Sequence, residues 1–254
     1  MRQRTLFVAV LAGLSVCGSV WALPVETQAV SQDGLWRLTA EPFTRTLLLQ
    51  DALGMQVRRY PWPDLPAAIP ASEVLTPVMV QNHPLRRSFV VVFGGAEVLW
   101  EISYNPQAEV IYDGLVHDYR LKEGLPRPGF LGVRATRLDQ PLDDFWIDRA
   151  SPHVLGRARW ARDEAGGQVQ VINLDIRRAR ARLGVPSAYQ LSAAQVLGPA
   201  DGRVLLLPAL DVTPAALPVC VSMTVWQMTP CPEMPLVPSG SLPGKTSRGI
   251  TGLQ

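Results

Sequence analysis

The sequence predicts an all-β protein built like a β-propeller, with about four blades. Short apolar segments recur along the chain; they are rich in Val, Ile, Leu and Phe and are bounded by Gly, Pro, Asp or Asn, the pattern typical of strands and turns. The clearest of these segments are residues 46–49, 89–93, 168–174 and 204–207. The 23 prolines are spread over the chain and argue against long helices.

A polar turn leads into an apolar strand at four places, at intervals of roughly 50 to 65 residues. These turns occupy residues 31–34, 82–87, 148–153 and 199–203. A second extended segment follows three of them, at residues 47–51, 98–105 and 169–175. One blade of four strands takes about 40–50 residues, so this rhythm predicts four blades with insertions. The largest insertion, residues 106–141, contains His117, and long loops between strands often carry function.

Two short segments depart from the β pattern, because residues 179–183 and 192–196 are predicted to be helical. The first belongs to the one basic run of the chain, which we interpret as a solvated helical or strand-edge face. This run contains Arg177, Arg178, Arg180 and Arg182. Acidic and basic residues are otherwise mixed and the net charge is only +2, which argues against a nucleic-acid partner.

Residues 1–22 are predicted to be a secretory signal peptide. Two arginines precede an apolar run that starts at Leu6, and Val20-Trp-Ala22 fits a small-residue cleavage site. The run is shorter than the about 18 residues that a membrane span needs. A lipoprotein signal ending at Cys17 is an alternative, although Val16 is bulkier than the residue expected before a lipidated cysteine. We therefore expect a periplasmic or secreted protein without a stable membrane span.

The mature chain is expected to form one β-domain over residues 23–230. A single all-β domain often reaches this length. The tail, residues 231–254, is rich in Pro, Gly, Ser and Thr and has little to bury, so it is predicted to be disordered.

Export also decides how the cysteines are interpreted. Once Cys17 leaves with the signal peptide, Cys220 and Cys231 remain, and in an oxidising compartment such a pair is best explained as a disulfide. By the chain-entropy model, closing this loop would contribute roughly 3 kcal/mol to the free energy of unfolding. The alternative is a Cu(I) site with soft ligands, although methionines more often fill a core. Its ligands would be Cys220, Met223, Met228, Cys231 and Met234.

Several longer stretches can be compared with known families. Residues 86–92 read Arg-Arg-Ser-Phe-Val-Val-Val, residues 99–109 read Leu-Trp-Glu-Ile-Ser-Tyr-Asn-Pro-Gln-Ala-Glu, and residues 111–120 read Ile-Tyr-Asp-Gly-Leu-Val-His-Asp-Tyr-Arg. Residues 137–145 read Arg-Leu-Asp-Gln-Pro-Leu-Asp-Asp-Phe, and residues 169–178 read Val-Gln-Val-Ile-Asn-Leu-Asp-Ile-Arg-Arg. Together they resemble the cytochrome d1 domain family. That family comprises the eight-bladed haem d1 propeller of dihaem nitrite reductases and related periplasmic proteins that assemble haem d1.

The resemblance covers about residues 30 to 185 and has clear departures. The chain has room for about half of eight blades, so it is truncated relative to the family. Where the relatives have a turn of the Met-Pro-His-Leu-Gly type, residues 184–189 read Gly-Val-Pro-Ser-Ala-Tyr, without a histidine. The family's Asp-Asp-Phe-Phe-Phe-Asp is here Asp-Asp-Phe-Trp-Ile-Asp, at residues 143–148. No Cys-x-x-Cys-His is present, which excludes covalent haem c and the built-in electron input of a reductase.

The resemblance implies a candidate cofactor site around His117. This histidine would be an axial ligand of the haem iron, or an acid–base group beside a tetrapyrrole. Arginines would pair with the carboxylates of the macrocycle, and tyrosines would stack on the ring or hydrogen-bond to it. The candidate arginines are Arg120, Arg134 and Arg137, and the candidate tyrosines are Tyr112 and Tyr119. The alternative for His117 is a loop histidine hydrogen-bonded to Asp113 or Asp118.

The other polar residues are expected to be structural. His83 and His153 are interpreted as polar turn residues. The carboxylates at 139, 143, 144 and 148 lack the alternating ligands and the glycine of a calcium loop, so they are expected to cap turns and pair with Arg137 and Arg149. Ser239 lies in no Gly-x-Ser-x-Gly motif, so serine hydrolysis has no support.

Three functions follow from these patterns. The favoured one is an exported, non-catalytic propeller-type protein that binds haem d1, a related tetrapyrrole or a protein such as a periplasmic redox partner, in a setting like nitrite reduction. The alternative is a structural or interaction module without a cofactor, in which two chains form a homodimer and cover each other's unpaired strand edges. An oxidoreductase that modifies a tetrapyrrole comes third, because no second catalytic group is identifiable.

Overall fold

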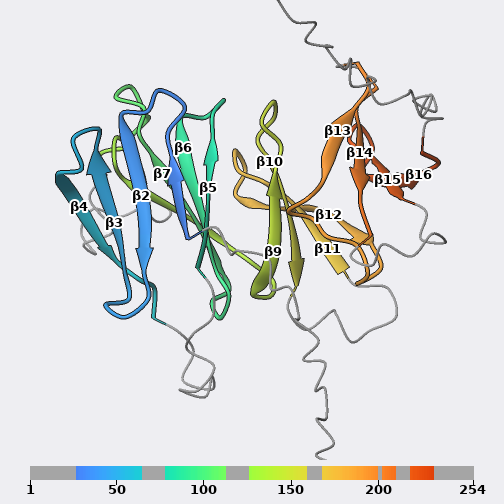
Figure 1. The fold of residues 1–254 in the computed structure, drawn as a ribbon, viewed down its shortest axis with the longest axis horizontal. Helices are drawn as coiled ribbons and strands as arrows, with labels where there is room; N and C mark the ends of the chain where they lie inside the picture. The colour runs from blue at the N-terminus through green and yellow to red at the C-terminus, as the bar shows by residue number, and fades with distance from the viewer. Residues whose placement is uncertain are drawn as a thin grey trace, which may run out of the picture.

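The protein consists of four four-stranded antiparallel sheets that follow one another along the chain (Figure 1). The computed structural model describes residues 27–64, 78–112, 126–158, 168–199, 202–209 and 218–231. In these ranges every regular element is a strand. The strands of each sheet are hydrogen-bonded in the order in which they occur in the chain. This arrangement confirms the predicted all-β, propeller-like fold and its four blades.

The strand bounds show how each sheet is built from hairpins. The first sheet contains β1 (Gln28–Val30), β2 (Trp36–Glu41), β3 (Thr46–Asp51) and β4 (Gln56–Pro61). The second contains β5 (Val78–His83), β6 (Ser88–Phe93), β7 (Val98–Ser103) and β8 (Val133–Arg137). The third contains β9 (Leu142–Ile147), β10 (His153–Ala158), β11 (Gln168–Asn173) and β12 (Arg178–Gly184). The fourth contains β13 (Gln195–Leu197), β14 (Val204–Leu207), β15 (Val219–Ser222) and β16 (Gln227–Thr229).

The four polar turns found in the sequence occupy the same place in each sheet, between its first and second strands. The first of them shows why such residues are used there. The Ser31 hydroxyl donates to the Asp33 carboxylate at 2.5 Å and accepts from the Trp36 amide at 2.9 Å. Short polar side chains thus satisfy backbone groups that the ladder leaves open. The recurrence of polar turns is therefore the sequence signal of a repeated blade.

Apolar cores lie between neighbouring sheets, and the two middle sheets are buried on both faces. In β6, Phe89, Val91 and Phe93 pack into the core shared with the first sheet. The alternate residues Val90 and Val92 pack into the core shared with the third sheet. Successive side chains point to opposite faces of a strand, so a strand between two cores becomes a continuous apolar run. This is why β6 is buried at all six of its positions.

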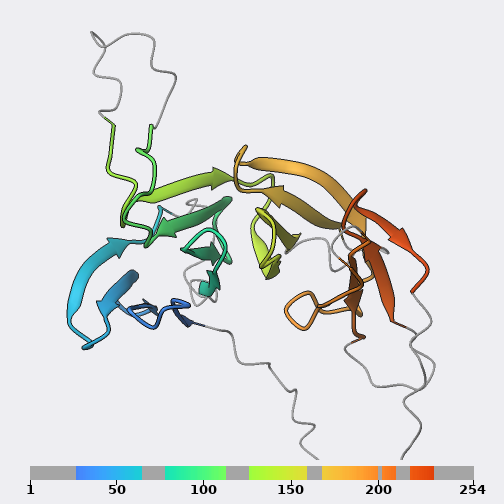
Figure 2. The same ribbon diagram turned by 90° about the horizontal axis from the view of Figure 1, so that it is seen from above.

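Seen from above, the sheets follow one another around an open arc (Figure 2). Colours run in order along the arc, from the blue first sheet to the red end of the fourth. The first strands β1 and β5 contact each other across neighbouring sheets. A third core, built from residues such as Leu155, Val171 and Leu205, joins the third sheet to the fourth. The first strands therefore face the hollow of the arc, and this hollow is where a site is expected.

Both predicted helices are wrong. Residues 179–183 lie within β12, where exposed arginines alternate with less exposed alanine and leucine side chains and the backbone pairs with β11. A period of two is the strand period, and tertiary pairing decided between strand and helix. Residues 192–196 run from a turn into β13. The predicted insertion 106–141 also contains β8, the outer strand of the second sheet.

The disulfide between Cys220 and Cys231 is confirmed. It links β15 to the residues after β16, and it leaves neither sulfur as a thiolate for Cu(I). In the described ranges, no three His, Cys, Asp or Glu residues are grouped as a metal would require. No helix among these residues is long and apolar enough to span a bilayer. The signal peptide predicted at 1–22 lies outside the described residues, and so does the predicted tail 231–254 apart from Cys231. Cys17, Met234 and Ser239 lie outside them as well.

Candidate functional site

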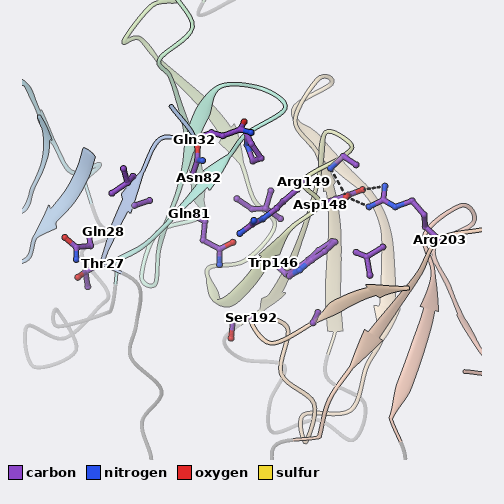
Figure 3. A pocket seen from close by; sticks show the side chains of 17 residues that line it. Thr27, Gln28, Gln32, Gln81, Asn82, Trp146, Asp148, Arg149, Ser192 and Arg203 are labelled. Carbon is purple, nitrogen blue, oxygen red and sulfur yellow. Dashed lines mark hydrogen bonds and ion pairs between the residues drawn. The ribbon is translucent and has the colours of Figure 1, made fainter. Parts of the chain in front are cut away.

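A cavity of about 1030 Å³ fills the hollow of the arc (Figure 3). The first strand of every sheet contributes to its wall: Gln28 from β1, Gln81 from β5, Trp146 from β9 and Val196 from β13. Ligand pockets commonly measure about 300 to 1,000 Å³, so this space is large enough for a cofactor-sized molecule.

Most of the wall near β1 and β5 consists of uncharged polar side chains. Asn82 accepts a hydrogen bond from the Tyr104 hydroxyl at 2.8 Å, which orients its amide. The Gln81 amide donates to the Phe145 carbonyl oxygen at 3.3 Å and so bridges the second and third sheets. Gln28 and Gln32 add two exposed amides. This side of the cavity offers hydrogen-bonding groups without charge.

The opposite wall is built on the turn between β9 and β10. Asp148 accepts hydrogen bonds from the Ala150 amide at 3.0 Å, from the Ser151 hydroxyl and from both terminal nitrogens of Arg203. Burial by itself raises the pKa of Asp148, but the bonds from Arg203, Ser151 and the Ala150 amide outweigh it, and the net pKa is lowered. The buried carboxylate is therefore ionised, and its charge is neutralised by Arg203.

Arg149 lies between two anchored neighbours in this turn, and its side chain is exposed. Figure 3 shows the Arg149 side chain between those of Gln81 and Asp148. Trp146, half-buried on β9, offers an indole ring on the same wall. The cavity thus combines one arginine and one aromatic face with several amides.

Histidines 83 and 153 join sheets rather than line the cavity. His83 is fully buried at the end of β5, and its Nε2 lies 3.0 Å from the Ser151 carbonyl oxygen of the third sheet. His153 lies 2.8 Å from the Ser151 hydroxyl through Nδ1, and its ring is 5.0 Å from that of Trp226 in the fourth sheet. Burial lowers the pKa of both histidines. Both are therefore neutral structural groups at pH 7.

The residues that the resemblance pointed to lie elsewhere, as far as they are described. Tyr112 and Arg134 line a second cavity of about 770 Å³, together with Arg86 and Glu101. Arg134 donates there to the Glu109 carbonyl oxygen at 2.6 Å.

Arg137 is exposed at the end of the outermost strand β8 and does not line the arc's hollow. His117, Tyr119 and Arg120 lie outside the described residues, as do Asp113 and Asp118. The structure therefore does not bring Tyr112 and Arg137 together at the hollow, and the role of His117 stays a prediction.

Three of the four clustered carboxylates, Asp139, Asp144 and Asp148, have structural partners, and these partners are not the predicted Arg137 and Arg149. Asp139 pairs with Arg182, and Asp148 pairs with Arg203. The Asp144 carboxylate accepts the Leu191 and Ser192 backbone amides at 2.8 and 3.1 Å. Sequence reasoning missed Arg149, Arg203 and Trp146 as residues of the hollow. Their positions in the sequence could have pointed to them, because Arg149 and Arg203 lie in the recurring turns and Trp146 lies two residues before one of these turns.

Comparisons with known proteins give a fold and no family assignment. No protein-family model matches the chain, and neither does any curated protein sequence. Among solved structures, the chain is similar to dihydro-heme d1 dehydrogenase NirN in complex with DHE, at 23% identity and a TM-score of 0.57 over 80% of this chain. The fold is that of a β-propeller. The chain spans 36% of the NirN chain's length.

Two further structures are similar at lower scores. The hydrazine synthase of Kuenenia stuttgartiensis has 10% identity and a TM-score of 0.45, over 79% of this chain and 52% of the synthase chain. AztD of Citrobacter koseri has 10% identity and a TM-score of 0.44, over 81% of this chain and 45% of its own.

Proposed function

We propose that this protein is an exported, non-catalytic carrier that binds a haem d1-related tetrapyrrole in the hollow of its arc of sheets. The observation that carries the proposal is the cavity itself, which is walled by the first strand of all four sheets. The likeness in fold to NirN, whose structure contains DHE, supports the choice of ligand class. The disulfide supports export, because such bonds persist in oxidising compartments.

The residues of the hollow fit the ring and its carboxylates. The space is large enough, Trp146 offers an aromatic face for stacking, and Arg149 offers a charge-assisted hydrogen bond to a carboxylate. Among the described lining residues there is no histidine, cysteine, methionine or tyrosine to bind the iron. An axial ligand would therefore come from outside this set, and His117 is the candidate. The bound haem would supply the colour and the redox chemistry.

An absorbance titration tests the proposal. The mature chain, residues 23–254, is titrated with haem d1 and with haem b as control, and a saturable spectral change selective for haem d1 is expected. A Ser192→Trp variant, which places an indole on the cavity wall, should abolish it. Ser187→Trp is the matched control, because Ser187 is exposed outside the cavity. Equal loss of binding in both variants, or no spectral change in the native chain, would contradict the proposal.

The proposed iron ligand has its own test. His117→Ala should change the absorbance of bound haem d1, because losing an axial nitrogen alters the ligand field of the iron. An unchanged spectrum at full occupancy would remove His117 as the ligand and leave the hollow as the binding site.

A further inference from the structure

We infer that the hollow selects an anionic ligand, and that Arg149 is the residue that fixes the oxyanion. The inference takes a carboxylated tetrapyrrole as ligand from the proposed function, but the preference for negative charge rests on the cavity alone. Of the described residues that line the hollow, the charged ones are Asp148, Arg149 and Arg203.

Two of these three charges cancel. The Asp148 carboxylate is 1% exposed and is bound by both terminal nitrogens of Arg203. A carboxylate that accepts bidentate bonds from an arginine, a serine hydroxyl and a backbone amide has little capacity left for a ligand. The pair therefore shapes the wall, and one positive charge remains, on Arg149.

The backbone on both sides of Arg149 is held in place by hydrogen bonds. The residue before Arg149 is anchored by Arg203, and the residue after it donates its backbone amide to Asp148. In the described part of the chain no carboxylate pairs with the Arg149 guanidinium. Because the backbone is already held, ligand binding at Arg149 restricts only its side chain, so more of the interaction appears as affinity.

The surroundings favour an oxyanion over a neutral group. The opposite wall presents the amides of Gln28, Gln32 and Asn82, which can donate hydrogen bonds and carry no negative charge. A guanidinium binds a carboxylate through two parallel hydrogen bonds, which are stronger than bonds between neutral groups. The hollow should therefore discriminate a free carboxylate from its ester.

The test compares Arg149→Gln with Arg149→Lys and with the control Arg178→Gln, since Arg178 is exposed on the outer strand β12. The probes are protoporphyrin IX, its dimethyl ester in the same detergent, and citrate, which has carboxylates but no ring. Porphyrin binding is followed by absorbance and citrate binding by calorimetry. We expect Arg149→Gln to weaken binding of the porphyrin acid by about tenfold or more, Arg149→Lys to restore part of it, and Arg178→Gln to change nothing. Binding of the ester should be weak and the same in all variants.

The outcomes separate this inference from the proposed function. Equal binding of acid and ester, unaffected by Arg149→Gln, would overturn the role of Arg149 and leave a tetrapyrrole site. Citrate binding that depends on Arg149, with no binding of either porphyrin or of haem d1, would overturn the tetrapyrrole and support the anion site. Loss of citrate binding to the same extent in Arg178→Gln would show a non-specific charge effect and overturn the inference.

Discussion

The two joints on either side of the third sheet hold the sheets together in different ways. Only residues 138–141 separate β8 from β9, and the joint between the second and third sheets is mainly apolar, built from residues such as Val90, Leu99 and Phe145. Residues 185–194 separate β12 from β13, and the joint between the third and fourth sheets adds buried charged groups to its apolar core.

The buried charges hold the longer linker in place. Asp144 accepts two linker amides, and Arg157 donates to the carbonyl oxygens of Pro186 and Tyr189. Fixing a residue's backbone costs about 1–2 kcal/mol, so a ten-residue linker needs more contacts to stay ordered than a four-residue one. The joint with the short connection also contains polar contacts, including the ion pair of Arg86 with Asp175. The joint with the long connection differs because its buried polar side chains bind the linker itself.

The largest expected loss of stability comes from a substitution in the apolar joint between the second and third sheets. Phe145→Ala removes a side chain that is 1% exposed and should lower the free energy of unfolding by about 3–5 kcal/mol, through lost burial and the cavity left behind. Urea denaturation of the mature chain measures it. Phe43→Ala is the control, because Phe43 is 99% exposed and its removal should change stability by less than about 0.5 kcal/mol. Similar losses in the two variants would show that the joint is not the source of stability.

The next largest loss of stability comes from a substitution at the joint between the third and fourth sheets. Asp148→Ala leaves Arg203 without its carboxylate at a site where the arginine side chain is only 19% exposed, and should cost about 2–4 kcal/mol. Asp139→Ala is the matched control, because its ion pair with Arg182 is solvent-exposed and should contribute about 0–1 kcal/mol. If both variants lost the same small amount in the urea assay, the third and fourth sheets would not be joined through Asp148.

A smaller effect depends on pH and involves both joints. The pKa of His83 and that of His153 are lowered in the folded protein, so the unfolded chain binds more protons as the pH falls below about 6.5. The free energy of unfolding should therefore have its full value above that pH. It should decrease as the pH falls through the histidine pKa of the unfolded chain towards the lower histidine pKa values of the folded protein. Urea midpoints between pH 8 and 5 measure this loss. His83→Gln should flatten part of the slope, and an unchanged slope would show that His83 does not contribute to it.

The smallest effect concerns a turn of the third sheet. Arg177 has a φ of 53°, a left-handed conformation that glycine adopts without a side-chain penalty. Arg177→Gly should therefore be neutral or raise the free energy of unfolding by up to about 1 kcal/mol. Arg178→Gly, one residue later at the start of β12, should lower it by about 0.5–1 kcal/mol. Thermal unfolding of the pair tests the assignment, and the opposite order of stability would contradict it.

The sequence predicted the parts of the fold that repeat, and missed the parts that depend on long-range contacts. Strands such as β6 and β14 were evident because a polar turn leads directly into each apolar run. β12 was mistaken for a helix because alternating arginine and alanine suits either state, and pairing with β11 decides between them. Arg149 was assigned to a carboxylate rather than to a cavity, because only the arc brings its turn opposite Gln81. The spacing of residues along the chain cannot show that four sheets line one cavity.

The chain-order pairing of every sheet has a consequence for how the protein folds. Neighbouring strands are sequence neighbours in all four sheets, so most pairings close only a short stretch of chain. The exception is the pairing of β7 with β8, which spans the long insertion between Ser103 and Val133. Topologies with local contacts fold faster than those with distant ones, because less entropy is lost before the first contacts form. A chain that emerges with its amino end first can complete one sheet at a time. This topology therefore favours an ordered addition of sheets over a search of the whole chain.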